Sequence, residues 1–291
     1  MVGVQQLLDA IRAIERGLDL AGRAYWFVSQ NVDTVLTALH LFLFATIDPF
    51  HPGQEFVGMA PIQQFTPLVQ AAADSALVAL ATWAFLRLMW AHGFRNRYTL
   101  RTLLPRVGLA ALLINFSLPL VQGAIDANNA LTDSIALVTR HEELLAVKGD
   151  FTWDLAAPGL YALTMVAIFT AYLLLGFAYV VRFAMLVALA ILAPAAALLF
   201  VLPETHHYSR LWASLFLSTL LMQPLQLLIL AIGFGLDHYG HLPVRHIFAL
   251  ASVYIVFKVP GALHTTSMLG TRAATLAKRE VTHVVHALAK A

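Results

Sequence analysis

Residues with the ligand types of a metal site lie between positions 237 and 246. One carboxylate and three imidazoles are present, from Asp237, His238, His241 and His246. Such groups bind zinc where a helix face or a rigid loop brings them together. Gly240 and Pro243 interrupt the segment, so it reads as a turn without a fixed ligand face. We predict solvated loop histidines here, with no metal and no cofactor.

A second set of polar side chains lies within the long apolar segment 211–236. On a helix its members fall within about 60° of one another, and they are Trp212, Thr219, Gln223 and Gln226. An amide in hydrocarbon needs a hydrogen-bond partner, so this stripe must contact protein or water. Two interpretations stay open: contact between helices of one bundle, or the wall of a conduit or a seam between subunits. Pro224 in this segment and Pro194 in the preceding one predict kinks, and the alanines after Pro194 offer a flat packing surface.

Catalytic chemistry is not indicated elsewhere. The sequence contains no HExxH, GxSxG or phosphate-cradling glycine loop, and it has no cysteine. Asp74 and Arg87 are 13 positions apart, which is about 20 Å along a helix, so they cannot pair within one helix. Each lies near an end of its apolar segment, and no acid lies mid-segment as an ion-coupled transporter usually requires. The sequence therefore predicts no enzyme and no catalytic residue.

The elements that carry these residues are membrane helices. Of 291 residues, 60% are hydrophobic and 12% are charged, and the mean hydropathy is +0.76. Soluble domains contain about 25% charged residues, so this composition indicates a polytopic membrane protein. The N-terminus lacks a charged region followed by a small-residue cleavage site, so no signal peptide is predicted. The predicted fold class is an all-α transmembrane helical bundle.

About five spans are predicted in a membrane core that covers residues 68–236. Their ranges are 68–92, 107–125, 155–181, 183–202 and 211–236. Arg182 separates the third span from the fourth, and the connector 203–210 joins the fourth to the fifth. An external loop is predicted for residues 126–154.

The remaining segments are shorter or amphipathic. Apolar residues at helical spacing predict an amphipathic helix over residues 1–24, and residues 25–67 hold a short apolar segment and an external loop. The apolar run within 26–47 is interfacial, re-entrant or a weak span, because a full span needs roughly 20 apolar residues. Residues 237–261 are predicted as a loop and a short re-entrant segment, in which 247–259 is favoured as a partial crossing. A basic amphipathic cytoplasmic tail is predicted for 262–291.

The distribution of charge predicts the orientation. Arginines without an acid among them mark one end of the first two spans, and they are Arg87, Arg95, Arg97, Arg101 and Arg106. The positive-inside rule makes them cytoplasmic anchors. The loop 126–154 carries six acids against two bases, which suits the external face. With five spans, the N-terminus is expected outside, the C-terminus in the cytoplasm and the connector 203–210 outside.

The fourth and fifth spans also carry a family resemblance. Their string ILAPAAALLFVLPET (191–205) is followed by Trp212 and by LLMQPLQ (220–226), and RYTLRTLLPRVGLAALLINFSLPL (97–120) leads into the second span. An Ala-Pro span, a Leu-Pro-x-Thr-like exit, a tryptophan and a glutamine-bearing span resemble the TrbL-type polytopic inner-membrane subunit of type IV secretion and conjugation systems. The resemblance covers roughly residues 68–236.

The resemblance implies an oligomeric channel or scaffold subunit of an inner-membrane apparatus for conjugative DNA transfer or pilus assembly. It implies partners that include copies of itself, a pilin, a bitopic scaffold subunit, secretion ATPases and phospholipid, with transferred DNA or protein as an indirect partner. It brings no catalytic residue. The alternative from another class is a small-solute membrane transporter or channel, which predicts internal repeats and a binding site near the bilayer midplane.

Overall fold

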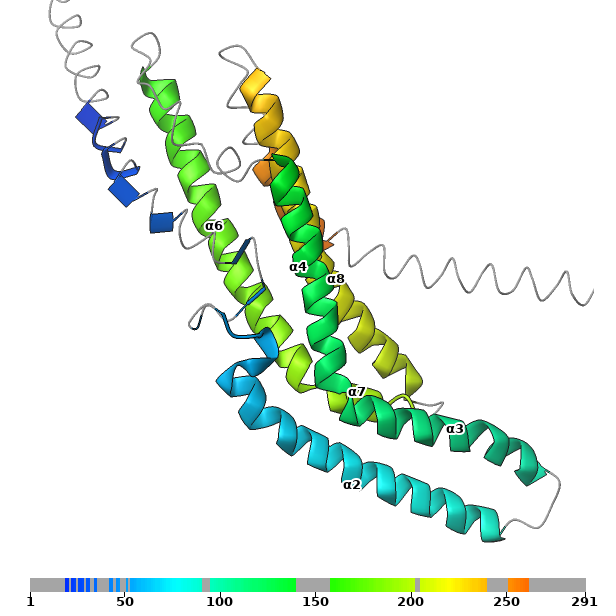
Figure 1. Ribbon diagram of the computed structural model, residues 1–291. Helices are drawn as coiled ribbons and strands as arrows, with labels where there is room; N and C mark the ends of the chain where they lie inside the picture. The colour runs from blue at the N-terminus through cyan, green and yellow to red at the C-terminus, as the bar shows by residue number, and fades with distance from the viewer. Residues whose placement is uncertain are drawn as a thin grey trace, which may run out of the picture. The chain divides into compact units, whose positions relative to one another are not determined.

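The computed structural model describes residues 53–90, 95–139, 158–201, 205–239 and 251–261, with single residues and short stretches between 19 and 51. Every regular element in these ranges is helical, and no strand occurs in them (Figure 1). The predicted all-α class is confirmed. The predicted amphipathic N-terminal helix up to residue 18, residues 140–154 of the predicted external loop 126–154, and the tail after residue 261 lie outside the described residues.

Three helices are long and apolar enough to cross a membrane, over Ala60–Trp83, Val166–Ile191 and His206–Gly233, among the described residues. A fourth crossing results if the bent pair Pro105–Asn115 and Ser117–Leu137 counts as one span. A shorter apolar helix covers Ala251–Gly261. The protein is therefore a multi-pass membrane protein, and the count among the described residues is lower than the five spans expected.

The helices divide into two compact units, and α4, α6 and α8 contribute residues to both. Unit 1 comprises residues 1–49, 129–183 and 223–257, and unit 2 comprises 50–128, 184–222 and 258–291. Each unit is described separately below.

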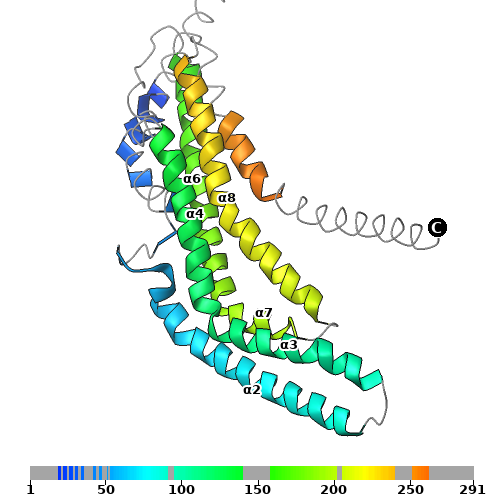
Figure 2. The ribbon, with the colours of Figure 1, turned by 45° about the vertical axis from the view of Figure 1, so that its right-hand side comes forward.

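Unit 2 contains a short helix η1 (Phe56–Gly58), the long helices α2 (Ala60–Trp90) and α3 (Arg95–Asn115), and the short α7 (Ala193–Leu198). Helices α2 and α3 lie side by side, and α7 packs on both (Figures 1 and 2). They share a core of buried residues from α2, α3 and the residue Val201 after α7, and the partly buried Ala197 and Leu198 of α7 pack against it; the buried members are Ala73, Leu77, Ala110, Ile114 and Val201. The small side chains allow the three helices to approach closely.

The break between α6 and α7 matches the kink predicted at Pro194. Helix α6 (Pro158–Ile191) ends one residue before α7, and Leu192 is the N-cap of α7. Pro194 then occupies the first turn, where its missing N–H is tolerated. Ala193 and Ala196 are buried, so the flat alanine surface does serve close packing. At Pro224, by contrast, α8 (His206–Tyr239) continues as one helix.

The second expected span, 107–125, is interrupted at Phe116. Helix α3 ends at Asn115, α4 (Ser117–Thr139) begins two residues later, and the pair is bent by 66°. Pro119 accounts for the break, because it has no N–H to donate to the Asn115 carbonyl and its ring crowds that carbonyl. At the same break, Ser117 Oγ donates a hydrogen bond to the Ile114 carbonyl at 2.9 Å. Helix α4 then runs on to residue 139, so the first half of the predicted external loop 126–154 is helical.

The division expected at Arg182 is absent from the structure. Helix α6 runs without interruption from residue 158 to residue 191, which is about 50 Å of helix. Arg182 lies within it and is only 3% exposed. Most of the expected third span and the first part of the fourth, residues 183–191, are therefore one helix. The physical reason is that no glycine, proline or turn-forming polar residue adjoins Arg182, so nothing breaks the backbone there.

This correction changes the expected topology. Five crossings predict the connector 203–210 outside and Arg106 inside. One crossing fewer along α6 predicts both on the same face, and the positive-inside rule predicts that this face is cytoplasmic.

Single cysteines test this topology, because the natural chain has none. Arg106 and Tyr208 are both exposed, so Arg106→Cys and Tyr208→Cys are expected to react with an impermeant maleimide only after spheroplasts are permeabilised. Leu137→Cys serves as the reference, because Leu137 is 77% exposed and lies about 30 Å along α4 from its start. It is expected to react without permeabilisation. Labelling of Arg106→Cys and Tyr208→Cys from opposite faces would instead support the topology expected from five spans, with the connector 203–210 outside.

Candidate functional site

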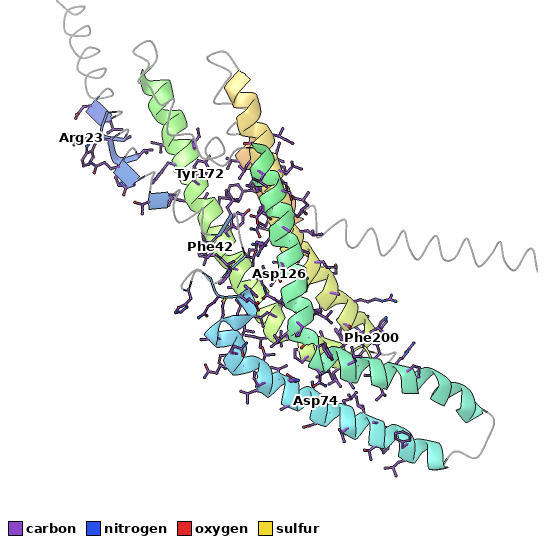
Figure 3. All side chains as sticks on the ribbon, in the orientation of Figure 1. Arg23, Phe42, Asp74, Asp126, Tyr172 and Phe200 are labelled. Atoms are coloured by element: carbon purple, nitrogen blue, oxygen red, sulfur yellow. The ribbon has the colours of Figure 1, made fainter. Side chains whose placement is uncertain are left out.

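Arg182 is the centre of a buried polar cluster in unit 1. It lies on α6, one turn after Tyr179, and its guanidinium carbon is 5.9 Å from the centroid of that ring. Around it, α4, α6, α8, the helix 251–261 and three residues nearer the N-terminus, Val35, Phe42 and Leu43, supply an apolar core. This core includes Tyr172, labelled in Figure 3, and Leu175 and Leu227. A charge in such surroundings is costly unless its hydrogen-bond donors are satisfied.

The Gln223 side chain on α8 is the main acceptor for this charge. Arg182 Nη2 donates to Gln223 Oε1 at 3.0 Å and to Thr46 Oγ1 at 3.4 Å. Thr46 Oγ1 donates to the same Gln223 oxygen at 2.7 Å. Gln223 Nε2 donates to the Leu43 carbonyl at 2.8 Å, so both ends of the amide are used. Gln223 is completely buried, which explains why this amide has protein partners.

The cluster also holds the segment around residues 42–46 against the helices. The Thr46 backbone and the Asn129 side chain on α4 exchange two hydrogen bonds, from Thr46 N to Oδ1 at 2.9 Å and from Nδ2 to the Thr46 carbonyl at 3.3 Å. Phe42 packs edge-on against Phe183 of α6, with ring centroids 5.7 Å apart. Thr46 lies outside the helical residues described before it, and its backbone N–H and carbonyl are both bonded to Asn129 of α4.

A second polar contact lies one turn further along α8. Gln226 Nε2 donates to the Val256 carbonyl at 3.1 Å, which connects α8 to the helix Ala251–Gly261. Gly233 permits the closest approach of this pair, because a Cβ at that position would overlap the Ser252 side chain. The apolar helix 251–261 therefore packs beside α8, and a partial or re-entrant crossing over 247–259 stays a prediction.

The stripe residues predicted on the fifth span all have contacts within the chain. Gln223 and Gln226 belong to unit 1 and are buried as described. In unit 2, Trp212 Nε1 donates to the Leu189 carbonyl at 3.0 Å, and Thr219 Oγ1 donates to the Leu215 carbonyl at 2.7 Å. Trp212, Gln223 and Gln226 thus contact other segments of the chain, while the bond that Thr219 Oγ1 donates lies within α8. A role in contacts between subunits, or in a conduit, stays a prediction.

The predicted cytoplasmic arginines lie on two neighbouring helices of unit 2. Arg87 is in the last turn of α2, and α3 begins at Arg95 and carries Arg97, Arg101 and Arg106. Arg106 is exposed. Asp74 is half-buried on α2, one residue after the buried Ala73. No group of three or more His, Asp or Glu side chains suited to a metal occurs in the described ranges, and most of the segment 237–246 lies outside them.

Sequence reasoning missed Arg182 as a site residue. The charge of Arg182 predicts the boundary of a span, because arginines of membrane proteins usually lie at the ends of their helices. One signal could have identified it: residues 155–202 form an apolar run with Arg182 as the sole charge and with no turn residues beside it. An arginine inside one helix must be buried in the bundle and must have partners there. Thr46 and Leu43 carry no comparable signal.

Comparisons with known proteins agree with this architecture. The model of the family described as "TrbL/VirB6 plasmid conjugal transfer like protein" matches residues 2–288 of the chain. Comparison with curated proteins and with solved structures gave no match. The family match spans both units, the buried cluster on α6 and α8, and the string that suggested the resemblance. The chain therefore belongs to the TrbL/VirB6 family, and it is a membrane subunit of a conjugal transfer system.

Proposed function

We propose that this protein is an oligomeric inner-membrane scaffold and channel subunit of a type IV secretion apparatus. Its work is the assembly of a membrane complex, and it carries out no catalytic step. Its proposed partners are copies of itself, a pilin, a bitopic scaffold subunit and secretion ATPases. Transferred DNA or protein would contact it only within the assembled complex.

The observation that carries this proposal is the closure of the buried polar cluster. The polar groups that a transporter would offer to a solute are instead bonded to one another: Arg182 and Thr46 to Gln223, and Gln223 to the Leu43 carbonyl. Such a cluster stabilises one arrangement of helices, which suits a scaffold. It supports the scaffold role over the small-solute transporter.

The exposed faces of the long helices support assembly with other membrane proteins. Large apolar side chains cover them, and among the most exposed are Phe177, Leu174, Ile232 and Leu217. In a membrane these faces meet lipid or other subunits. A multi-copy complex would bury part of this surface, so copies of the chain are the first proposed partners.

The mass of the purified complex tests the proposal. Native mass spectrometry of the protein extracted from donor cells is expected to show several copies of the 31.8 kDa chain together with other secretion subunits. A donor strain without the protein is expected to lose conjugal transfer, and expression of the chain in trans is expected to restore it. A stable monomer without partners would contradict the scaffold role. Saturable solute flux in liposomes that contain the protein alone would favour the transporter.

A further inference from the structure

An apolar groove in unit 2 is not used by the buried cluster. Its volume is about 280 Å³, and it lies between the start of α8, the alanines of α7 and the α3–α4 break. A single water needs about 30 Å³, so the groove can accept a much larger group. Its floor is made of small residues, among them Ala193, Ala196 and Ala213, and its wall includes the stacked rings of Trp212 and Phe216. Among the described residues that line it, only Ser117, Ser209 and Trp212 carry polar side-chain atoms.

Three cationic or titratable side chains lie on the two helices that line this groove, close in sequence to its lining residues. On α8, His206 lies three residues before the lining residue Ser209, and Arg210 lies three residues before Ala213. These spacings put His206 one turn before the lining residues of α8, and Arg210 beside Ser209 at the edge of the lining face. On α3, Arg106 lies seven residues, or two turns, before the lining residue Leu113. Arg106 and His206 thus each precede the lining residues of their own helix.

We propose that this groove binds an anionic phospholipid. An acyl chain would occupy the apolar groove beside Trp212, and the phosphate would contact Arg106, Arg210 and His206. The groove and the cations fit the two ends of such a lipid, and exposed apolar residues beside the groove, Leu120 and Leu217, place its mouth in the membrane. The cytoplasmic leaflet, to which the topology above assigns the arginines, carries the anionic lipids. The proposal depends on the chain being a membrane subunit, not on its scaffold or channel role.

Quenching of Trp212 by brominated lipids tests the proposal. The purified full-length protein in neutral detergent would be titrated with phosphatidylglycerol or phosphatidylcholine brominated on one acyl chain. Because the chain has five tryptophans, the Trp212 signal is the difference between the natural protein and Trp212→Phe. The lipid concentration that gives half-maximal quenching is expected to be at least tenfold lower for phosphatidylglycerol than for phosphatidylcholine. Each basic residue near an anionic headgroup raises the affinity about fivefold.

Charge variants identify the headgroup site. The double variant R106Q/R210Q is expected to lose the preference for phosphatidylglycerol, and R106K/R210K, which keeps both charges, is expected to retain most of it. Arg23→Gln is the matched control, because Arg23 is an exposed arginine of unit 1 that pairs with Asp19. It is expected to leave the preference unchanged. If R106Q/R210Q does not fold, the natural protein and the lysine variant still decide the question.

Four results would overturn the proposal. Equal quenching by the two lipids would show that there is no site for an anionic headgroup. An unchanged preference in R106Q/R210Q would show that the two arginines do not bind the headgroup. Full loss of the preference when inorganic phosphate is added would reveal an anion site independent of the groove. Protection of Trp212 from both lipids in an oligomer, but not in a monomer, would make a second copy the occupant. A variant that loses conjugal transfer but keeps the preference for phosphatidylglycerol would bear on the scaffold role and not on the lipid site.

Discussion

Gln223→Leu is expected to lower the apparent Tm of the purified protein by roughly 5–10 °C, because a buried charge loses its acceptor. The variant removes the oxygen that receives bonds from Arg182 and Thr46, and it removes the donor to the Leu43 carbonyl. Truncating one partner of a buried charged group costs about 3–5 kcal/mol, since the remaining charge stays in an apolar setting. Thermal unfolding followed by size-exclusion chromatography in detergent measures the change.

Gln226→Leu provides the matched control on the same helix. Gln226 is equally buried, but it makes one neutral bond, to the Val256 carbonyl, and its Oε1 has no hydrogen-bond partner among the described residues. A neutral bond between membrane helices contributes about 0.6 kcal/mol, so the expected loss of stability is small. Gln223→Leu and Gln226→Leu with equal Tm values would show that Arg182 does not depend on Gln223. The earlier expectation, that Gln223 acts in subunit association, predicts normal Tm with reduced oligomer mass.

Gly233→Ala is the second variant with a large expected effect. The added Cβ would overlap the Ser252 side chain, so α8 and the helix 251–261 could not keep their present distance. Overpacking of a tight contact costs about 1–3 kcal/mol, and separation of the helices would also strain the bond from Gln226 to the Val256 carbonyl. We expect a lower Tm and faster proteolytic cleavage near residues 251–261 in detergent.

A compensating change makes this prediction specific. The double variant G233A/S252G moves the Cβ from one helix to the other, so it is expected to recover most of the lost stability. Ser252→Gly alone is the control, and it is expected to cost about 1 kcal/mol through helix propensity. Gly233→Ala with unchanged stability, or a double variant that is weaker than both single variants, would contradict the close contact of these helices.

These two contacts connect distant parts of the chain to one helix. Gln223 holds residues 43 and 46 near the N-terminus, and Gln226 with Gly233 holds the helix that precedes the C-terminal tail. Helix α8 therefore determines how both apolar end segments of the chain lie in unit 1. In a scaffold subunit, a shift of either segment is expected to alter assembly before it alters membrane insertion.

The sequence by itself determined the class of protein and the residues that needed partners. Hydropathy is a sum over neighbouring residues, so the all-helical membrane class follows from composition and run length without knowledge of any contact. The need of Gln223 and Gln226 for partners follows from the cost of an unbonded amide in hydrocarbon. The break at Pro194 follows from the geometry of one residue. The family resemblance was carried by local strings of the same kind.

Tertiary structure alone decided which groups meet. Arg182 contacts Thr46, which lies 136 positions away, and Gln223 contacts Leu43 at a separation of 180 positions. No local pattern encodes such pairs, because they depend on how whole helices pack. From the sequence, the charge of Arg182 predicts that it lies at a membrane boundary, because its buried partners are distant in the sequence. Burial of its guanidinium among separate segments of the chain allows α6 to continue through it.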